Sequence, residues 1–179
     1  MVDIQIRGEI WDNDSSEVLR WLGWRDLTCP NDIAKALEAA GGDEVTVLVN
    51  SPGGDLFSGA EIRSMLRRYN GRTEALIQGY AASAATVAIS ACDVIRCESG
   101  GLCCYHNPVS TAEGDYRDMS GASKSLKNAR DTILDAYLAR PVCKTTREEL
   151  AALMDKDIFI TPDLDEAYRD GASFGFVRK

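Results

Sequence analysis

The chain has a single histidine, His106, in 179 residues, and none of its six cysteines stands in a C-x-x-C pair. One imidazole and scattered thiols leave little for a Cys/His zinc site, so the sequence predicts neither a metal nor another cofactor. We expect the thiols to be reduced and mostly buried, where cysteine behaves as a small apolar side chain. Cys103 and Cys104 are adjacent in an expected strand and therefore point to opposite faces.

Basic residues are also in deficit, because 20 Lys and Arg stand against 28 Asp and Glu, for a net charge of −8. Such a chain is a poor match for nucleic acid or an anionic membrane, so we expect a protein, a peptide or a small molecule as partner. No stretch approaches the roughly 20 apolar residues of a membrane span, and the first residues resemble no basic, apolar export signal. The sequence predicts a cytoplasmic protein.

The length fits one α/β domain with a sizeable core, over residues 1–179. Alternating or β-branched segments predict strands at residues 2–6, 45–49, 73–77, 94–97 and 102–105, the last two around a Ser-Gly-Gly turn. Helical spacing predicts helices at residues 31–40, 56–69, 84–91, 113–139 and 146–154, with a last helix near 163–169. Residues 11–30 show no single period and are predicted to be a loop with a possible helical turn.

Ser83 is the one nucleophile in a stretch of small residues, Gln78-Gly79-Tyr80-Ala81-Ala82-Ser83-Ala84-Ala85. A strand is predicted before it and an Ala-rich helix after it, so Ser83 falls at a strand-to-helix junction. Such a junction aims unpaired backbone N–H groups at whatever lies beside the hydroxyl. Taken alone, the stretch favours the alternative, a close-packed helix start in which small residues let a helix approach a sheet.

A second turn follows the strand at 45–49 and reads Asn50-Ser51-Pro52-Gly53-Gly54-Asp55. Two glycines after a proline permit positive φ and bring bare N–H groups close to an anion or a developing oxyanion. An ordinary βα turn is the alternative, and a phosphate loop is disfavoured because the Gly-Lys-Ser/Thr ending is missing. Since His106 is the sole imidazole, any Ser–His mechanism in this chain must use it.

Four motifs occur along the chain in a fixed order: Asn50-Ser51-Pro52-Gly53-Gly54, Gly79-Tyr80-Ala81-Ala82-Ser83-Ala84-Ala85, Tyr105-His106-Asn107-Pro108 and Asp157-Ile158-Phe159-Ile160-Thr161. Together they resemble the ClpP-type serine peptidases, in particular the phage and prophage members. The resemblance covers nearly the whole chain. It implies a crotonase-like α/β spiral of short βα units with a protruding long helix, and hydrolysis of peptide bonds.

Carried over position by position, the resemblance makes Ser83 the nucleophile, His106 the base and Asp157 the acid that orients it. The N–H groups of Gly54 and Ala84 become the oxyanion hole. A serine hydroxyl needs a neutral imidazole to take its proton, and a carboxylate on the other ring nitrogen fixes the tautomer. Because the chain departs from the family pattern after Thr161, the nearby Asp155 and Asp163 compete with Asp157 for the role of the acid.

The resemblance further implies a polypeptide substrate and a homo-oligomer, built as a ring or as stacked rings, in which the helix at 113–139 packs between subunits. The resemblance implies one of two kinds of partner. One is an ATPase unfoldase, and the other is the capsid or scaffold protein of a phage, which the enzyme would cut during maturation of the phage head. Two alternatives stay open: a crotonase-like enzyme that binds acyl-CoA, and a catalytically inactive assembly subunit.

Overall fold

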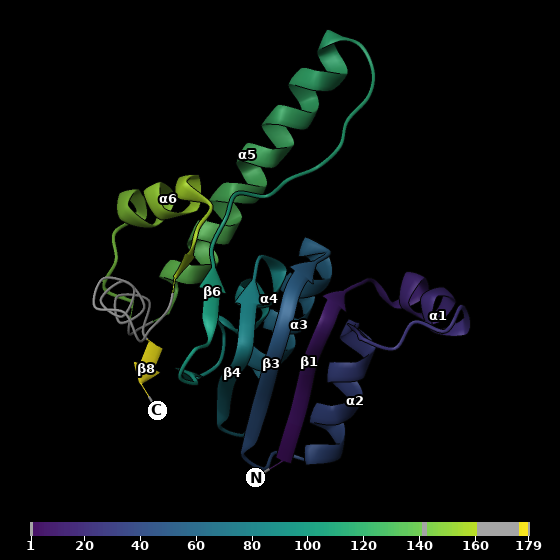
Figure 1. Cartoon of the computed structure of the whole chain (residues 1–179), viewed down its shortest axis with the longest axis vertical. Coiled ribbons are helices and arrows are strands. Elements are labelled where there is room, and N and C mark those ends of the chain that lie inside the picture. Colours follow the sequence, from purple (N-terminus) through teal and green to yellow (C-terminus); the bar gives the residue numbers. More distant parts are fainter. Residues whose placement is uncertain (1, 141–142, 161–175, 179) are drawn as a thin grey trace.

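The computed structural model describes residues 2–140, 143–160 and 176–178. In these ranges the chain forms one mixed α/β structure around a sheet (Figure 1). The strands are β1 (Val2–Ile10), β2 (Leu27–Thr28), β3 (Val45–Gly54), β4 (Thr73–Ala82), β5 (Val94–Cys97), β6 (Leu102–Cys104), β7 (Phe159–Ile160) and β8 (Phe176–Arg178). The helices are α1 (Asn13–Trp21), α2 (Pro30–Ala40), α3 (Leu56–Arg68), α4 (Ala84–Ile89), α5 (Tyr116–Leu138) and α6 (Arg147–Lys156).

The main sheet runs in the order β2-β1-β3-β4-β5-β8, and every neighbouring pair in it is parallel. Beyond the end of β5, β6 pairs in parallel with the last residues of β4, and β7 pairs with β6 in the antiparallel direction. The carboxyl ends of β3, β4 and β6 therefore lie at one edge of the sheet. This edge is where ligands bind in open α/β sheets.

The core explains why the central strands have so few polar residues. The inward side chains of β3 and β4 are fully buried, among them Val45, Val47, Val49, Ala75 and Ile77. The helices α2, α3 and α4 pack on β1, β3 and β4 and on one another, so the strand residues that face them are apolar. The strand residues between these are only half-buried at Leu48 and Glu74. The predicted fold class, α/β with short βα units, is confirmed.

The helix α5 stands out from this body and projects away from the sheet, and the chain between β6 and α5 climbs beside it (Figure 1). Its buried residues, Ile133, Leu134 and Tyr137, all lie in its last two turns. The predicted long helix is thus confirmed, and it is anchored only at its C-terminal end. None of the helices in the described ranges combines the length and the apolar character that a membrane crossing requires.

Two local expectations differ from the structure, and a third feature, the pairing of β5 and β6, was not predicted. Residues 13–21 form a full helix, α1, because Asp12 caps it by accepting a bond from the backbone N–H of Ser15. The helix predicted at 31–40 begins at Pro30 with Cys29 as its N-cap, and the carboxylate of Asp32 in its first turn accepts a bond from the backbone N–H of Cys29, at 2.9 Å. The strands β5 and β6 do not pair with each other but follow one another along β4. The predicted last helix lies outside the described residues.

Candidate active site

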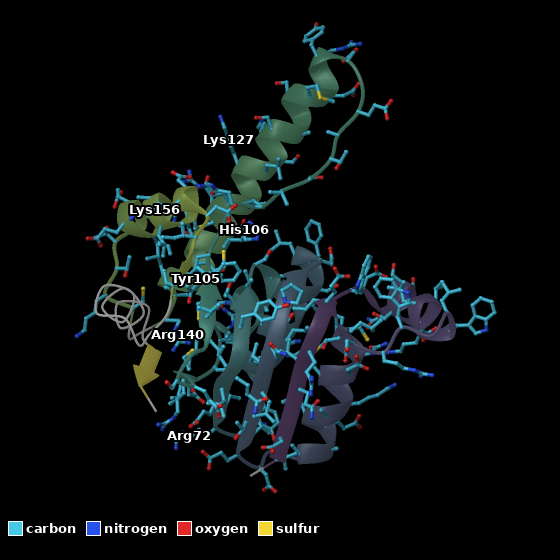
Figure 2. All side chains as sticks on the ribbon, viewed as in Figure 1. Arg72, Tyr105, His106, Lys127, Arg140 and Lys156 are labelled. Carbon is cyan, nitrogen blue, oxygen red and sulfur yellow. The ribbon has the colours of Figure 1, made fainter. Side chains whose placement is uncertain are left out.

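Three neighbouring strands deliver the predicted site residues to one place. Gly54 ends β3, Ser83 follows β4 directly, and His106 comes two residues after β6. Gly54, Ser83, Ala84 and His106 all line one cavity of about 510 Å³. Figure 2 shows His106 where the chain leaves β6 toward the base of α5. The parallel order of the sheet is what brings together residues that are far apart in the sequence.

Ser83 lies in a strained turn. Its φ of 53° and ψ of −127° fall outside the regions that side chains with a β-carbon normally occupy. A backbone of this kind costs on the order of 1–3 kcal/mol and persists only where the surroundings fix it. Here the N–H of Ser83 donates to the carbonyl of Cys104 at 3.1 Å, and its carbonyl begins α4. The half-buried side chain is left at the cavity wall.

The two glycines of the β3 turn have separate tasks. A β-carbon on Gly53 would come within 2.5 Å of the carbonyl oxygen of Ala82 and 2.7 Å of the Cβ of Ser83. On Gly54, whose φ is +142°, a β-carbon would collide with the carbonyl oxygen of Ile10. Only glycine therefore lets β3 pass against the turn of Ser83 while its end opens into the cavity.

His106 is half-buried, and its Nδ1 lies 2.7 Å from the carbonyl oxygen of Asn107. A carbonyl oxygen can only accept, so Nδ1 carries the proton in this arrangement and Nε2 keeps its lone pair. This is the tautomer that a base for Ser83 needs. The described hydrogen bonds include none between the side chains of Ser83 and His106.

Asp157 is the C-cap of α6, in the left-handed region with a φ of 49°, and the described contacts do not join its side chain to that of His106. The antiparallel pair β6–β7 begins two residues later and sets Cys103 opposite Ile160 and Cys104 opposite Phe159. The carboxylate of Asp157 accepts a long bond of 3.8 Å from the thiol of Cys104. Burial and the neighbouring carboxylate of Asp157 raise the pKa of this thiol.

The competing carboxylate of Asp155 is already engaged. It accepts bonds of 2.8 Å from the side-chain amide of Asn107 and from the guanidinium of Arg130. Asp155 thus ties the loop after His106 to α5 and α6, which is a structural arrangement. Asp163, the other competing residue, lies outside the described residues.

Two residues near Ser83, Thr86 and Tyr137, were not predicted from the sequence to belong to the site. The hydroxyl of Thr86 donates to the carbonyl of Ser83 at 2.6 Å, and it lies 2.7 Å from the hydroxyl of Tyr137 on α5. The only sign of this pair in the sequence is a threonine within the Ala-rich start of a helix. Nothing in the spacing of the residues indicates that Tyr137 approaches it.

Much of the remaining wall of the cavity is apolar, and its polar members include Asp55, Ser110, Thr111 and Ser125. The apolar part includes side chains of α3, α4 and α5, namely Leu56, Phe57, Val87, Leu126 and Ile133. Within the described ranges, no three His, Cys, Asp or Glu side chains gather as they would around a metal ion. The arrangement offers a hydroxyl, an imidazole and backbone N–H groups next to a surface for apolar groups.

The comparison with protein families gives one result that bears on this geometry. Residues 31–178 match the family model described as Clp protease. The matched segment contains the two turns, His106 and Asp157, and it extends over most of the chain. A search of the curated proteins finds no match. With more than half of its length matched, the chain belongs to the Clp protease family, whose members are peptidases.

Proposed function

We propose that the protein is a serine endopeptidase that hydrolyses peptide bonds in polypeptides with Ser83, His106 and Asp157. The observation that carries this proposal is the shared cavity in which Ser83, with its strained backbone, His106, Gly54 and Ala84 lie together. Family membership supports the reaction type, peptide-bond hydrolysis.

In this mechanism the oxygen of Ser83 attacks the carbonyl carbon of the peptide bond while Nε2 of His106 takes its proton. The N–H groups of Gly54 and Ala84 stabilise the negative charge that develops on the carbonyl oxygen. His106 then gives its proton to the leaving amine, and water releases the acyl group from Ser83 in a second step. Asp157 holds the Nδ1 proton of the imidazolium, in place of the carbonyl of Asn107. The apolar wall beside the nucleophile suits an apolar substrate side chain.

The test is labelling of the purified protein with a fluorophosphonate, together with hydrolysis of fluorescein-labelled casein. We expect one covalent adduct, at Ser83, and loss of both signals in Ser83→Ala, with casein turnover down by about 10⁶-fold as in other triad knock-outs. Peptidase activity that survives in a clean Ser83→Ala preparation contradicts the mechanism. An unreactive parent protein favours the two alternatives, an acyl-CoA enzyme of similar fold or an inactive assembly subunit.

The physiological setting is a further part of the proposal. Cleavage of capsid or scaffold protein in a phage or prophage is one setting, and work with an ATPase unfoldase is the other. Both rest on the resemblance of the motifs. Portal and capsid genes beside this gene would favour the first setting, and an unfoldase gene would favour the second.

A further inference from the structure

The carbonyl of Ser83 is held by an unusual number of donors. It accepts from the backbone N–H of Thr86 at 3.0 Å, from that of Val87 at 3.3 Å, and from the hydroxyl of Thr86 at 2.6 Å. The two N–H bonds belong to the helix start, whereas the hydroxyl bond is an addition supplied by one side chain. Thr86 is buried, so water does not compete for this bond.

Tyr137 completes the arrangement from another element. Its hydroxyl lies 2.7 Å from that of Thr86, and both groups are buried. Since the hydroxyl hydrogen of Thr86 goes to a carbonyl, which can only accept, Tyr137 must be the donor between the two hydroxyls. Burial raises the pKa of Tyr137, so the phenol keeps the proton that it donates. The result is a directed chain of hydrogen bonds from Tyr137 through Thr86 to Ser83.

The peptide group that accepts these hydrogen bonds also carries one of the proposed oxyanion donors. The carbonyl of Ser83 and the N–H of Ala84 belong to the same peptide group, which is planar and trans. Fixing the carbonyl therefore fixes the direction of the N–H on the opposite side. The unusual ψ of Ser83, −127°, is the torsion that sets this plane.

Tyr137 also contacts the segment that leads from β6 to His106. Its ring meets that of Tyr105 edge to face, with centroids 5.1 Å apart and an interplanar angle of 84°. Tyr105 directly precedes His106 in the chain. The hydroxyl of Tyr137 thus contacts Thr86, which bonds the carbonyl of Ser83, and its ring contacts Tyr105, the residue before His106.

We propose that Thr86 and Tyr137 are positioning residues, which orient the Ser83–Ala84 peptide so that its N–H points at the oxyanion of the reaction. This inference rests on the proposed peptidase function. It gives the C-terminal end of α5 a role in orienting the oxyanion hole. Neither residue contacts the reacting atoms in this role, and both act through the backbone of Ser83.

The experiment measures kcat and KM with a fluorogenic peptide and the rate of fluorophosphonate labelling. Thr86→Val keeps the shape and removes the hydroxyl, and we expect kcat and labelling to fall by about 10²-fold, at the lower end of the loss of an oxyanion donor, with KM changed less than about twofold. Tyr137→Phe leaves the Thr86 bond in place and should cost about tenfold. Thr86→Ser restores the hydroxyl and should recover activity to within about threefold of the parent.

Two matched controls separate positioning from a general loss of structure. Thr132→Val removes a hydroxyl that also bonds a helix carbonyl, that of Asn128, on the exposed surface of α5. Tyr69→Phe removes a phenol that donates to the carbonyl of Asp43, away from the cavity. Both should react like the parent.

The double variant Thr86→Val/Tyr137→Phe should be no slower than Thr86→Val alone, because the two hydroxyls act in one chain. If the parent is labelled at Ser83 while Thr86→Val and Tyr137→Phe are labelled equally fast, the positioning role is wrong and the peptidase proposal stands. The positioning role is also wrong if Thr86→Ser is as slow as Thr86→Val. A parent that is not labelled overturns both proposals.

Discussion

Gly53 and Ser83 lie so close together that a β-carbon on the glycine would approach the Cβ of the serine to 2.7 Å. Gly53→Ala must therefore push the nucleophile turn away from β3. Because displacements of about 1 Å cost on the order of 10²-fold in rate, we expect at least that loss in kcat. The measurement is casein hydrolysis alongside the thermal unfolding midpoint.

Gly42→Ala is the matched control for this substitution. Gly42 has a φ of +98°, close to the +92° of Gly53, but an added β-carbon would meet nothing within 4 Å. Both variants bear the same backbone strain, about 1–2 kcal/mol. Equal activity in the two variants would show that contact with Ser83 is unimportant.

Asp157→Asn tests the assignment of the acid. The substitution keeps the size of the side chain and removes the charge that would stabilise the imidazolium, so kcat should fall by up to about 10⁴-fold with little change in stability. Asp155→Asn is the comparison, and we expect it to weaken the contacts with Asn107 and Arg130 while most of the activity remains. Asp163→Asn should leave kcat unchanged. The acid is misassigned if Asp157→Asn turns over like the parent and one of the other two does not.

Five of the six cysteines should be inert in the folded protein. Five are buried and only Cys143 is partly exposed. Burial raises the pKa of Cys92 to about 12, and a hydrogen bond with Cys97 together with burial raises that of Cys103. Since the thiolate is the reactive form, a disulfide reagent at pH 8 should titrate one thiol in the native protein and six after unfolding in guanidinium chloride.

Cys143→Ser should then leave no fast-reacting thiol. Two or more fast thiols in the native parent would contradict this prediction.

The helix α5 should take part in self-association. Its apolar stripe begins on the core with Tyr137 and continues at helical spacing through Leu126 to Met119 and Tyr116, which is 81% exposed. We expect light scattering to give a mass that is a multiple of 19.5 kDa, and Met119→Asp to shift it toward the monomer. Asn128→Ala, on the opposite face of the same helix, should not. A fully active monomer would refute this expectation.

The sequence was a good guide where one element decides the local structure. The strand and helix on either side of Ser83, the end of the helix predicted to residue 40 and the start of the helix predicted from residue 146 all depend on neighbours in the chain, and the structure confirms them. Gly41 is the C-cap of the first of these two helices, and a capping box of Thr146 and Glu149 begins the second. The motifs also placed Gly54, Ser83 and His106, which the structure brings to one cavity. Local chemistry sufficed for these residues.

Other features depend on distant partners and could not be derived. That β5 and β6 both pair with β4 follows from the space available along that strand, and the turn between them carries no sign of it. The bond between Thr86 and Tyr137 spans 51 residues. The helix α1 was missed because residues 11–30 show no single period, and in the structure its apolar residues Val18 and Trp21 are exposed, as is its C-cap Leu22.

Because α5 is buried only at its C-terminal end, its N-terminal end can move sideways while Tyr137 stays in place. Its 23 residues span about 34 Å, so a sideways movement of about 3 Å at Tyr116 tilts the axis by only about 5°. Such a tilt hardly moves the hydroxyl of Tyr137, which sits near the pivot. Rotation of α5 about its own axis is different, because it swings the phenol directly away from Thr86. If Tyr137 has the proposed positioning role, torsion of α5 should therefore disturb the turn of Ser83 more than bending of the helix does.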